Sequence, residues 1–182
     1  MMEANKTTQN SNHDVARTDP RESGTQLRPG LWHTINERYP GSMIAKDTFV
    51  PLAPLAKPLN RSRLVMVSSC GVHRKIDPPL DVCHPLGDFR FRRVPSDSKP
   101  ADLTIHQLKY PHDDADVDIN VIFPIERLQE FVAEGVLGGL APDFFSFIGY
   151  NMDPDRFEST VAHDIAQAVA EEKADIALLV PA

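Results

Sequence analysis

The stretch EEKADIALLVPA (residues 171–182) decides the predicted fold. Its run from Ile176 to Val180 is short and continuously apolar, as in a strand that is buried on both faces. A helical pattern ends only a few residues before it, and a helix followed by a short turn and an apolar strand is typical of a parallel α/β sheet. We therefore predict a central parallel strand, which a crossover helix would normally follow. Since the pattern stops at Ala182, we expect the chain to be the front part of a larger α/β unit.

Further strand and helix patterns lie upstream of this run. Three stretches have the composition of strands: residues 63–69, 89–94 and 103–108. A helix is predicted to begin at Pro124 and to end at Gly135, and a longer one begins with Asp153 as N-cap and Pro154 as first residue. Together they predict an α/β fold with an open, mostly parallel, doubly wound sheet of the flavodoxin or Rossmann kind, incomplete at its C-terminus.

The chain divides into three segments by composition. Residues 1–28 are polar and nearly free of apolar side chains, so we expect them to be disordered. Residues 29–62 form a Pro-rich segment that is expected to be extended and to wrap the domain surface. Residues 63–182 carry the ordered α/β domain.

Charge and hydropathy exclude several classes of partner. The 182 residues carry 19 basic and 26 acidic side chains, a balance that argues against a nucleic-acid partner. No apolar stretch approaches the roughly 20 residues of a membrane span, and the N-terminus lacks the apolar core of a signal peptide. The sequence therefore predicts a cytoplasmic protein, in which Cys70 and Cys83 are free thiols.

Two stretches contain residues that could carry chemistry. Cys70 follows a strand and precedes His73 by three residues, so it could be a thiolate with its base, or simply a small residue that packs in a tight turn. His106 and His112 both precede an acidic stretch (residues 113–118). Together with its aspartates they could form a hard-metal site, or the stretch could be a solvated acidic loop. The stretch lacks the glycine and the distal glutamate of an EF-hand.

Two other motifs favour structural roles. Cys83-His84 lacks the paired short spacings of a zinc site, and we predict no bound metal. The glycines of residues 135–139 follow a helix instead of a strand, which favours a helix end and a turn over a dinucleotide-binding loop.

An ordered series of motifs resembles one protein family. The motifs are SSCGVHRKIDPPLD (68–81), GDFRFRRVP (87–95), HDDADVDINVIFPIERLQEFVAEGVLGGLAPDFFSFIGY (112–150) and ADIALLVPA (174–182). This series resembles the selenoprotein B family, which comprises subunits of glycine, betaine, sarcosine and D-proline reductases, and it is most similar to the D-proline reductase type. The resemblance implies that residues 63–182 are the N-terminal part of a reductase-subunit domain.

The resemblance implies reductive cleavage of a C–N bond in an amino-acid-like substrate. A selenol or thiol attacks the carbon that bears nitrogen, a pyruvoyl-type carbonyl on a partner subunit holds the substrate amine, and a dithiol or thioredoxin-like protein is the reductant. This chain itself would hold no cofactor. The selenocysteine or cysteine is expected just after Ala182, and an in-frame UGA and a naturally short chain are the two alternatives.

Polar groups at the strand tips are the candidate site residues. If the sheet is parallel, they converge on the edge where the last strand ends. The candidates are Cys70, His73 and His112 as catalytic groups, and Gly71, Asp88, Asp118 and Asn120 as substrate-binding groups. Two other functions stay open: a non-catalytic α/β binding or scaffold subunit, and a thiol enzyme that uses Cys70 itself.

Overall fold

The computed structural model describes residues 37–38, 40 and 53–182. The predicted disorder of residues 1–28 and most of the predicted wrapping segment fall outside these residues. The described stretch 53–182 lies within one compact unit. Among the described residues, no helix is both long enough and apolar enough to cross a bilayer.

A five-stranded sheet forms the centre of this unit. Its strands are β1 (Arg63–Ser68), β3 (Phe91–Pro95), β5 (Gly139–Leu140), β6 (Asp143–Phe147) and β7 (Ile176–Val180). A separate antiparallel pair consists of β2 (Val72–Arg74) and β4 (Leu103–Ile105). The α-helices are α2 (Asp113–Val117), α3 (Ile125–Ala133), α4 (Pro154–Phe157) and α5 (His163–Glu171), and a π-helical segment (Glu158–Ala162) joins the last two. Short 3₁₀ turns cover Leu59–Arg61, Pro100–Asp102 and Ile119–Val121.

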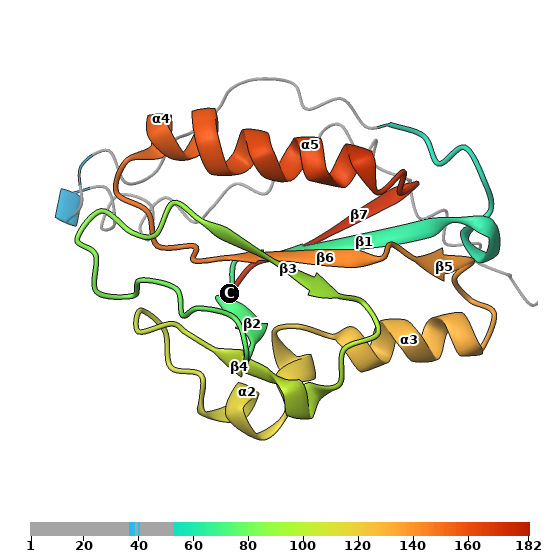
Figure 1. Cartoon of the computed structure of the whole chain (residues 1–182). Helices are drawn as coiled ribbons and strands as arrows, with labels where there is room; N and C mark the ends of the chain where they lie inside the picture. The colour runs from blue at the N-terminus through green and yellow to red at the C-terminus, as the bar shows by residue number, and fades with distance from the viewer. Residues whose placement is uncertain (1–36, 39, 41–52) are drawn as a thin grey trace, which may run out of the picture. The chain divides into compact units, whose positions relative to one another are not determined.

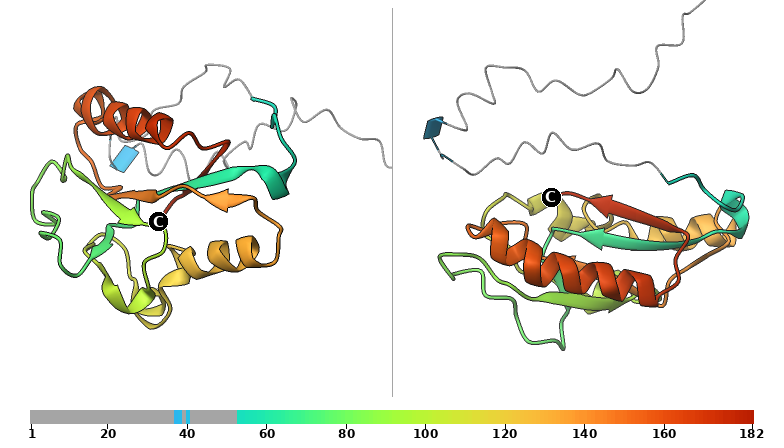
Figure 2. Two further views of the ribbon diagram at one scale, coloured as in Figure 1. Left: turned by 45° about the vertical axis from the view of Figure 1, so that its right-hand side comes forward. Right: turned by 90° about the horizontal axis from the view of Figure 1, so that it is seen from above.

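Strand β1 organises the sheet. It runs parallel to β5, β6 and β7, whereas β3 runs antiparallel to β6. Helices α4 and α5 cover one face, and α3, α2 and the β2–β4 pair lie on the other (Figure 1). Figure 2 shows the same layers from two further directions. The predicted α/β fold with an open, mostly parallel sheet is therefore confirmed.

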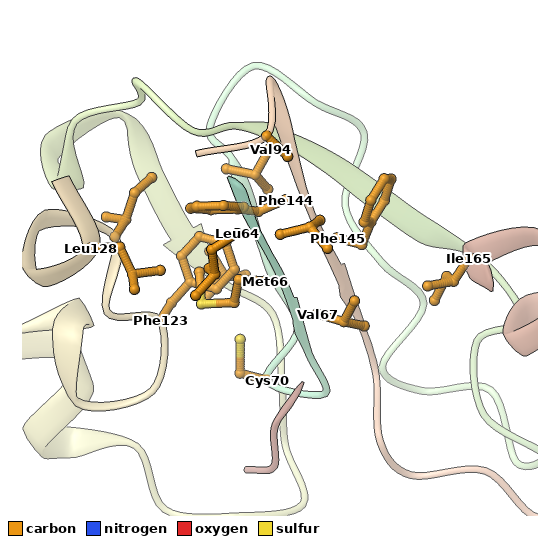
Figure 3. Packing of buried hydrophobic residues seen from close by; sticks show 14 of the residues in the cluster. Leu64, Met66, Val67, Cys70, Val94, Phe123, Leu128, Phe144, Phe145 and Ile165 are labelled. Atoms are coloured by element: carbon orange, nitrogen blue, oxygen red, sulfur yellow. The ribbon is translucent and has the colours of Figure 1, made fainter. Parts of the chain in front are cut away.

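The hydrophobic core lies against both faces of β1. The β1 residues from Leu64 to Val67 are buried. Beside them, the rings of Phe123 and Phe144 pack edge to face (Figure 3). A strand that is buried on both sides needs apolar residues at consecutive positions, and the sequence supplies them.

The long C-terminal helix begins and packs as predicted. The Asp153 carboxylate accepts a hydrogen bond from the backbone N–H of Arg156 at 3.1 Å, and Pro154 is the first helical residue. Val161, Ile165 and Ala168 are buried against the sheet. These side chains recur at helical spacing, so one face of the helix is apolar.

The prediction that the last strand is central is wrong for the described structure. β7 pairs with β1 from Leu64 to Ser68, and within residues 53–182 no strand lies on its other side. Its side chains alternate between half-buried and exposed, and Leu179 is 70% exposed. β1 occupies the centre because it carries partners along both edges, a property that an apolar run does not reveal.

Two local predictions also need correction. The stretch predicted as an acidic loop forms helix α2 and the following 3₁₀ turn. Three aspartates in the first turn of α2 suit the positive end of the helix dipole, which stabilises the helix. The turn predicted after the helix is present over residues 134–138, and only Gly139 departs from it, because it begins β5 and pairs with Arg63.

Gly138 packs directly on the backbone before β1. A Cβ at this position would lie 2.5 Å from the carbonyl carbon of Arg61, whereas a Cβ at Gly139 would meet nothing within 4 Å. We expect Gly138→Ala to lower the free energy of unfolding by about 2 kcal/mol through overpacking. Gly139→Ala, its matched control, should change it by no more than about 0.5 kcal/mol. Urea denaturation of both variants measures the difference, and equal stabilities would contradict the packing described.

Candidate functional site

The carboxyl ends of β1 and β7 meet at one edge of the sheet. The Ser68 hydroxyl donates to the carbonyl oxygen of Val180 at 3.0 Å. One residue further on, the backbone N–H of Ala182 donates to the Ser69 hydroxyl oxygen at 3.0 Å. Two consecutive serines therefore hold the last residues of the chain beside the tip of β1.

A cavity of about 330 Å³ opens next to Ala182. It is lined by Tyr110, Pro111, His112, Asp113, Asp114, Ala115, Val121, Ile122 and Ala182. His112, a predicted catalytic group, has its Nδ1 2.9 Å from an Asp116 carboxylate oxygen and its Nε2 3.2 Å from the carbonyl oxygen of Gln107. Both contacts fix the imidazole ring at the wall of this cavity.

Tyr110 connects the same cavity to the tip of β1. Its hydroxyl donates to the carbonyl oxygen of Cys70 at 2.9 Å. Burial raises the pKa of Tyr110 to about 12, so the phenol stays protonated at neutral pH and remains a donor. No sequence pattern singled out Tyr110, because it lies in a turn region with no strand or helix signal of its own.

The Cys70 side chain points into the core (Figure 3). Its sulfur lies 3.8 Å from the Ser146 hydroxyl oxygen, and the residue is fully buried. Burial raises the pKa of the Cys70 thiol, which disfavours the thiolate at neutral pH. This environment suits the packing alternative, and a catalytic role for Cys70 stays a prediction.

Gly71 uses its backbone groups within the fold. Its N–H donates to the carbonyl oxygen of Phe147 at 2.9 Å, and its own carbonyl oxygen accepts from the N–H of His106 at 3.0 Å. Its φ is +73°, and a Cβ would lie 2.4 Å from the carbonyl oxygen of His106. Only glycine fits this crossing from β1 into β2. Substrate binding by Gly71 stays a prediction.

His73 lies with His106, and the two rings form a hydrogen-bonded pair. His73 Nε2 is 2.5 Å from His106 Nδ1, and His73 Nδ1 is 2.7 Å from the carbonyl oxygen of Arg74. His73 is buried, whereas His106 is half-buried. Both histidines stand out in the sequence, but their pairing could not be predicted because it depends on the pairing of β2 with β4.

Asp88 lies apart from this edge cavity, in a second cavity of about 420 Å³. Its carboxylate accepts from the backbone N–H of Asp81 at 2.6 Å and from the Arg90 guanidinium at 2.8 and 2.5 Å. In the same cavity, the Arg156 guanidinium lies 4.0 Å from the centroid of the Phe89 ring. Asp88 therefore holds the loop before β3 in place.

Asp118 and Asn120 form a third, separate group. The Asp118 carboxylate accepts from the backbone N–H of Asn120 at 3.0 Å and from its side-chain amide at 2.8 Å. The Asn120 side chain in turn accepts from the backbone N–H of Glu126 and donates to the Glu126 carboxylate. These contacts join the 3₁₀ turn to the first turn of α3.

The structure thus brings only part of the predicted site together. Cys70, Gly71 and His73 follow β1 as expected, and His112 borders the cavity beside Ala182. Asp88 and the Asp118–Asn120 pair lie in other environments. Nowhere in the part of the chain that the structure describes do three or more His, Cys, Asp or Glu side chains form a group that could hold a metal ion.

Comparison with known proteins gives one relationship. The chain is 30% identical over 142 residues to D-proline reductase subunit gamma from Acetoanaerobium sticklandii. The match covers 75% of this chain and 57% of that protein, so the chain spans little more than half the length of this relative. No family model and no solved structure matches the chain. The identity supports a distant relationship to this reductase family.

The two cysteines should differ sharply in reactivity. We expect iodoacetamide at pH 7 to modify Cys83, which is exposed, and to leave Cys70 unmodified until the protein unfolds. Burial both blocks access to Cys70 and raises its pKa. Peptide mass spectrometry with and without urea measures the two sites. Rapid modification of Cys70 in folded Cys83→Ser protein would contradict this expectation and would support the thiol-enzyme alternative.

Asp88 should make stability depend on pH. Burial works against the charged carboxylate, but hydrogen bonds from Arg90 and Asp81 outweigh it and leave the pKa of Asp88 lowered. A carboxylate whose folded-state pKa is lowered stabilises the protein above its unfolded pKa, which is about 3.9, and this contribution is lost as the pH falls through the folded-state pKa.

We therefore expect Asp88→Asn to be about 2 kcal/mol less stable than the wild type at pH 7. The gap should close in acid, below about pH 4. Denaturant titrations between pH 7 and pH 3 measure it, with Asp97→Asn, at an exposed position, as the control. A gap that stays constant over this range would show that the Asp88 charge is not responsible.

Proposed function

We propose that this protein is a subunit of a selenol- or thiol-dependent reductase that cleaves a C–N bond of an amino-acid-like substrate. The observation that carries the proposal is the identity with D-proline reductase subunit gamma over 142 residues. The substrate class comprises D-proline, glycine, betaine and sarcosine. The proposed setting is the cytoplasm, in complex with other subunits.

The proposed reaction centre is the carboxyl edge of β1 and β7. We place the redox-active selenocysteine or cysteine in the residues that follow Ala182. Three features support this position: Ser69 fixes Ala182 beside the tip of β1, a cavity opens next to it, and His112 and Tyr110 line that cavity. In open α/β sheets, ligands bind outside the carboxyl ends of the strands.

In the proposed reaction, a dithiol supplies the two electrons that reductive cleavage of the C–N bond requires. The selenolate or thiolate attacks the carbon that bears nitrogen, a C–Se or C–S bond forms, and the C–N bond breaks with its electron pair on nitrogen, which takes up a proton. A thiol then attacks the selenium or sulfur, the carbon takes up a proton, and a selenide–sulfide or disulfide forms. A dithiol or a thioredoxin-like protein reduces this bond. The pyruvoyl-type carbonyl that holds the substrate amine is proposed to lie on a partner subunit.

A second candidate is a non-catalytic α/β binding or scaffold subunit. An apolar groove of about 270 Å³ lies between β7 and α5, and its lining includes Phe157, Val169 and Leu179. Exposed apolar surface of this kind is typical of a face that packs against another protein. Activity separates the two candidates, because a scaffold contributes no groups to the reaction.

The reductase proposal is tested on the complete complex. We expect the complex isolated from its native host to consume at least one of the four substrates when dithiothreitol is present, with the product of C–N cleavage detected by mass spectrometry. His112→Asn should lower kcat about 100-fold, the scale of a lost acid–base group. Asp97→Asn, which lies outside the cavity, should leave kcat unchanged. Full activity of His112→Asn would favour the scaffold candidate.

The nucleophile is tested by the coding DNA. We expect the codons after Ala182 to include an in-frame UGA or a cysteine codon, followed by an open reading frame. Sequencing of the gene checks this directly. A reading frame that continues without either codon near Ala182 would remove the proposed position of the nucleophile.

A further inference from the structure

We propose that His73 and His106 form a proton-transfer pair near the tip of β1. His106 gives a proton to the substrate, and His73 holds the His106 ring in the orientation that this transfer needs. The ligand class is an amine: the nitrogen that leaves when a C–N bond breaks. The role of the pair in that reaction rests on the proposed reductase function.

The two imidazole rings meet edge to edge. Their centroids are 4.8 Å apart, their planes differ by 10°, and His73 Nε2 lies 2.5 Å from His106 Nδ1. The distance between the ring centroids is longer than the N–N distance by about two ring radii. The two centroids and the two nitrogens therefore lie nearly on one line, and the rings lie nearly in one plane with the hydrogen bond between them. Parallel stacking face to face would bring the centroids much closer than this in-line arrangement.

The backbone fixes where each proton lies. A carbonyl oxygen can only accept, so His73 Nδ1 carries a hydrogen that it donates to the carbonyl oxygen of Arg74 at 2.7 Å. In the neutral ring, His73 Nε2 is then an acceptor, and His106 Nδ1 must donate to it. The remaining nitrogen, His106 Nε2, is left without a hydrogen and is free to take one up.

His106 Nε2 is accessible, whereas His73 is sealed. His106 is half-buried, and no group in the described residues forms a hydrogen bond to its Nε2. Buried polar side-chain atoms without a partner are confined, among the described residues, to Asn151 Nδ2. Proton uptake at His106 Nε2 would create an imidazolium whose Nδ1–H still points at His73 Nε2, and a charge-assisted hydrogen bond is stronger than a neutral one.

The surroundings keep His73 neutral. Burial lowers the pKa of His73, and the positive charges of a protonated His106 and of Arg92 add to this effect. The carbonyl oxygen of Arg74 and the Asp77 carboxylate act in the opposite direction, but Asp77 is already paired with the Arg74 guanidinium at 2.7 Å. His73 therefore stays an acceptor at neutral pH, as the arrangement requires.

The fold places the pair next to the turn that follows β1, although neither histidine lines the cavity beside Ala182. Val72 pairs with Ile105 in the β2–β4 ladder, which sets Gly71 opposite His106 and makes His73 a diagonal neighbour of His106. The N–H of His106 donates to Gly71, the residue directly after Cys70. His106 thus flanks the same turn to which Tyr110 is bonded.

The chemical task is delivery of a proton to nitrogen. When the C–N bond breaks, its electron pair passes to nitrogen, which gains the proton from His106 Nε2, and the imidazolium returns to the neutral ring. No electron passes through either histidine. The dithiol named above supplies the electrons and, through solvent, restores the proton. His73 serves the role that a carboxylate serves in a catalytic triad, holding the tautomer and orientation of the acting imidazole.

Nitrogen-15 NMR of the full chain tests the pair itself. With 15N-labelled histidine at pH 7.5, we expect both rings to carry hydrogen on Nδ1, with a scalar coupling between His106 Nδ1 and His73 Nε2 across the hydrogen bond. His73→Gln keeps an acceptor near this position and should keep His106 in that tautomer, whereas His73→Met should not. Backbone amide signals of β2 and β4 verify folding. An Nε2–H tautomer of His106 in the wild type would overturn the proposal.

Kinetics of the reductase complex test whether the His73–His106 pair takes part in the reaction. We expect His106→Asn to lower kcat about 100-fold with little change in KM. His163→Asn, an exposed histidine on α5, is the matched control. A fully active His106→Asn complex would overturn the proton-transfer role and leave the reductase function intact. An inactive wild-type complex would instead overturn the reductase function, while the NMR result would still decide the hydrogen-bonded pair.

Discussion

The structure depends on the parallel pairing of β1 with strands on both of its edges. β1 joins β7 along five residue pairs and β5 and β6 on the opposite side, and both of its faces are covered by apolar side chains. Because β1, β6 and β7 run in the same direction, their carboxyl ends lie at the same edge of the sheet. This constraint brings Ser69 and Ala182, which are distant in sequence, to one edge, and the hydrogen bond from Tyr110 to the carbonyl oxygen of Cys70 adds Tyr110 to it.

Much of the fold could be predicted because its signals are local. The apolar run of β1, the Asp153-Pro154 helix start and the apolar face of α5 each depend on a few neighbouring residues. Strand order depends instead on which strands pair along each edge. Composition would favour the wholly apolar β7 as the central strand over β1, which begins with Arg63 and ends with Ser68, and the structure shows the opposite order. Helix α2 was missed because its stability comes from aspartates at its N-terminus and from one buried alanine, not from an apolar stripe.

The candidate site was harder to predict than the fold. The expectation that polar groups follow strand ends placed His73 and Gly71 correctly after β1, but it treated every such group as part of one site. Asp88 and Asn120 have short-range partners, Arg90 and Glu126, that satisfy them within their own loops. The His73–His106 pair depends on the register of two three-residue strands, and such short strands carry little sequence signal.

Within residues 53–182, the outer edge of β7 pairs with no strand, and this has a consequence for handling the chain by itself. From Ile176 to Val180 the strand carries no charge, no proline and no bulge, and these are the devices by which proteins normally keep an exposed edge from pairing with another molecule. Its backbone donors and acceptors form a template that any extended segment can extend. We therefore expect samples of the isolated chain to self-associate as their concentration rises, and short β-strand peptides that pair with this edge should reduce the association.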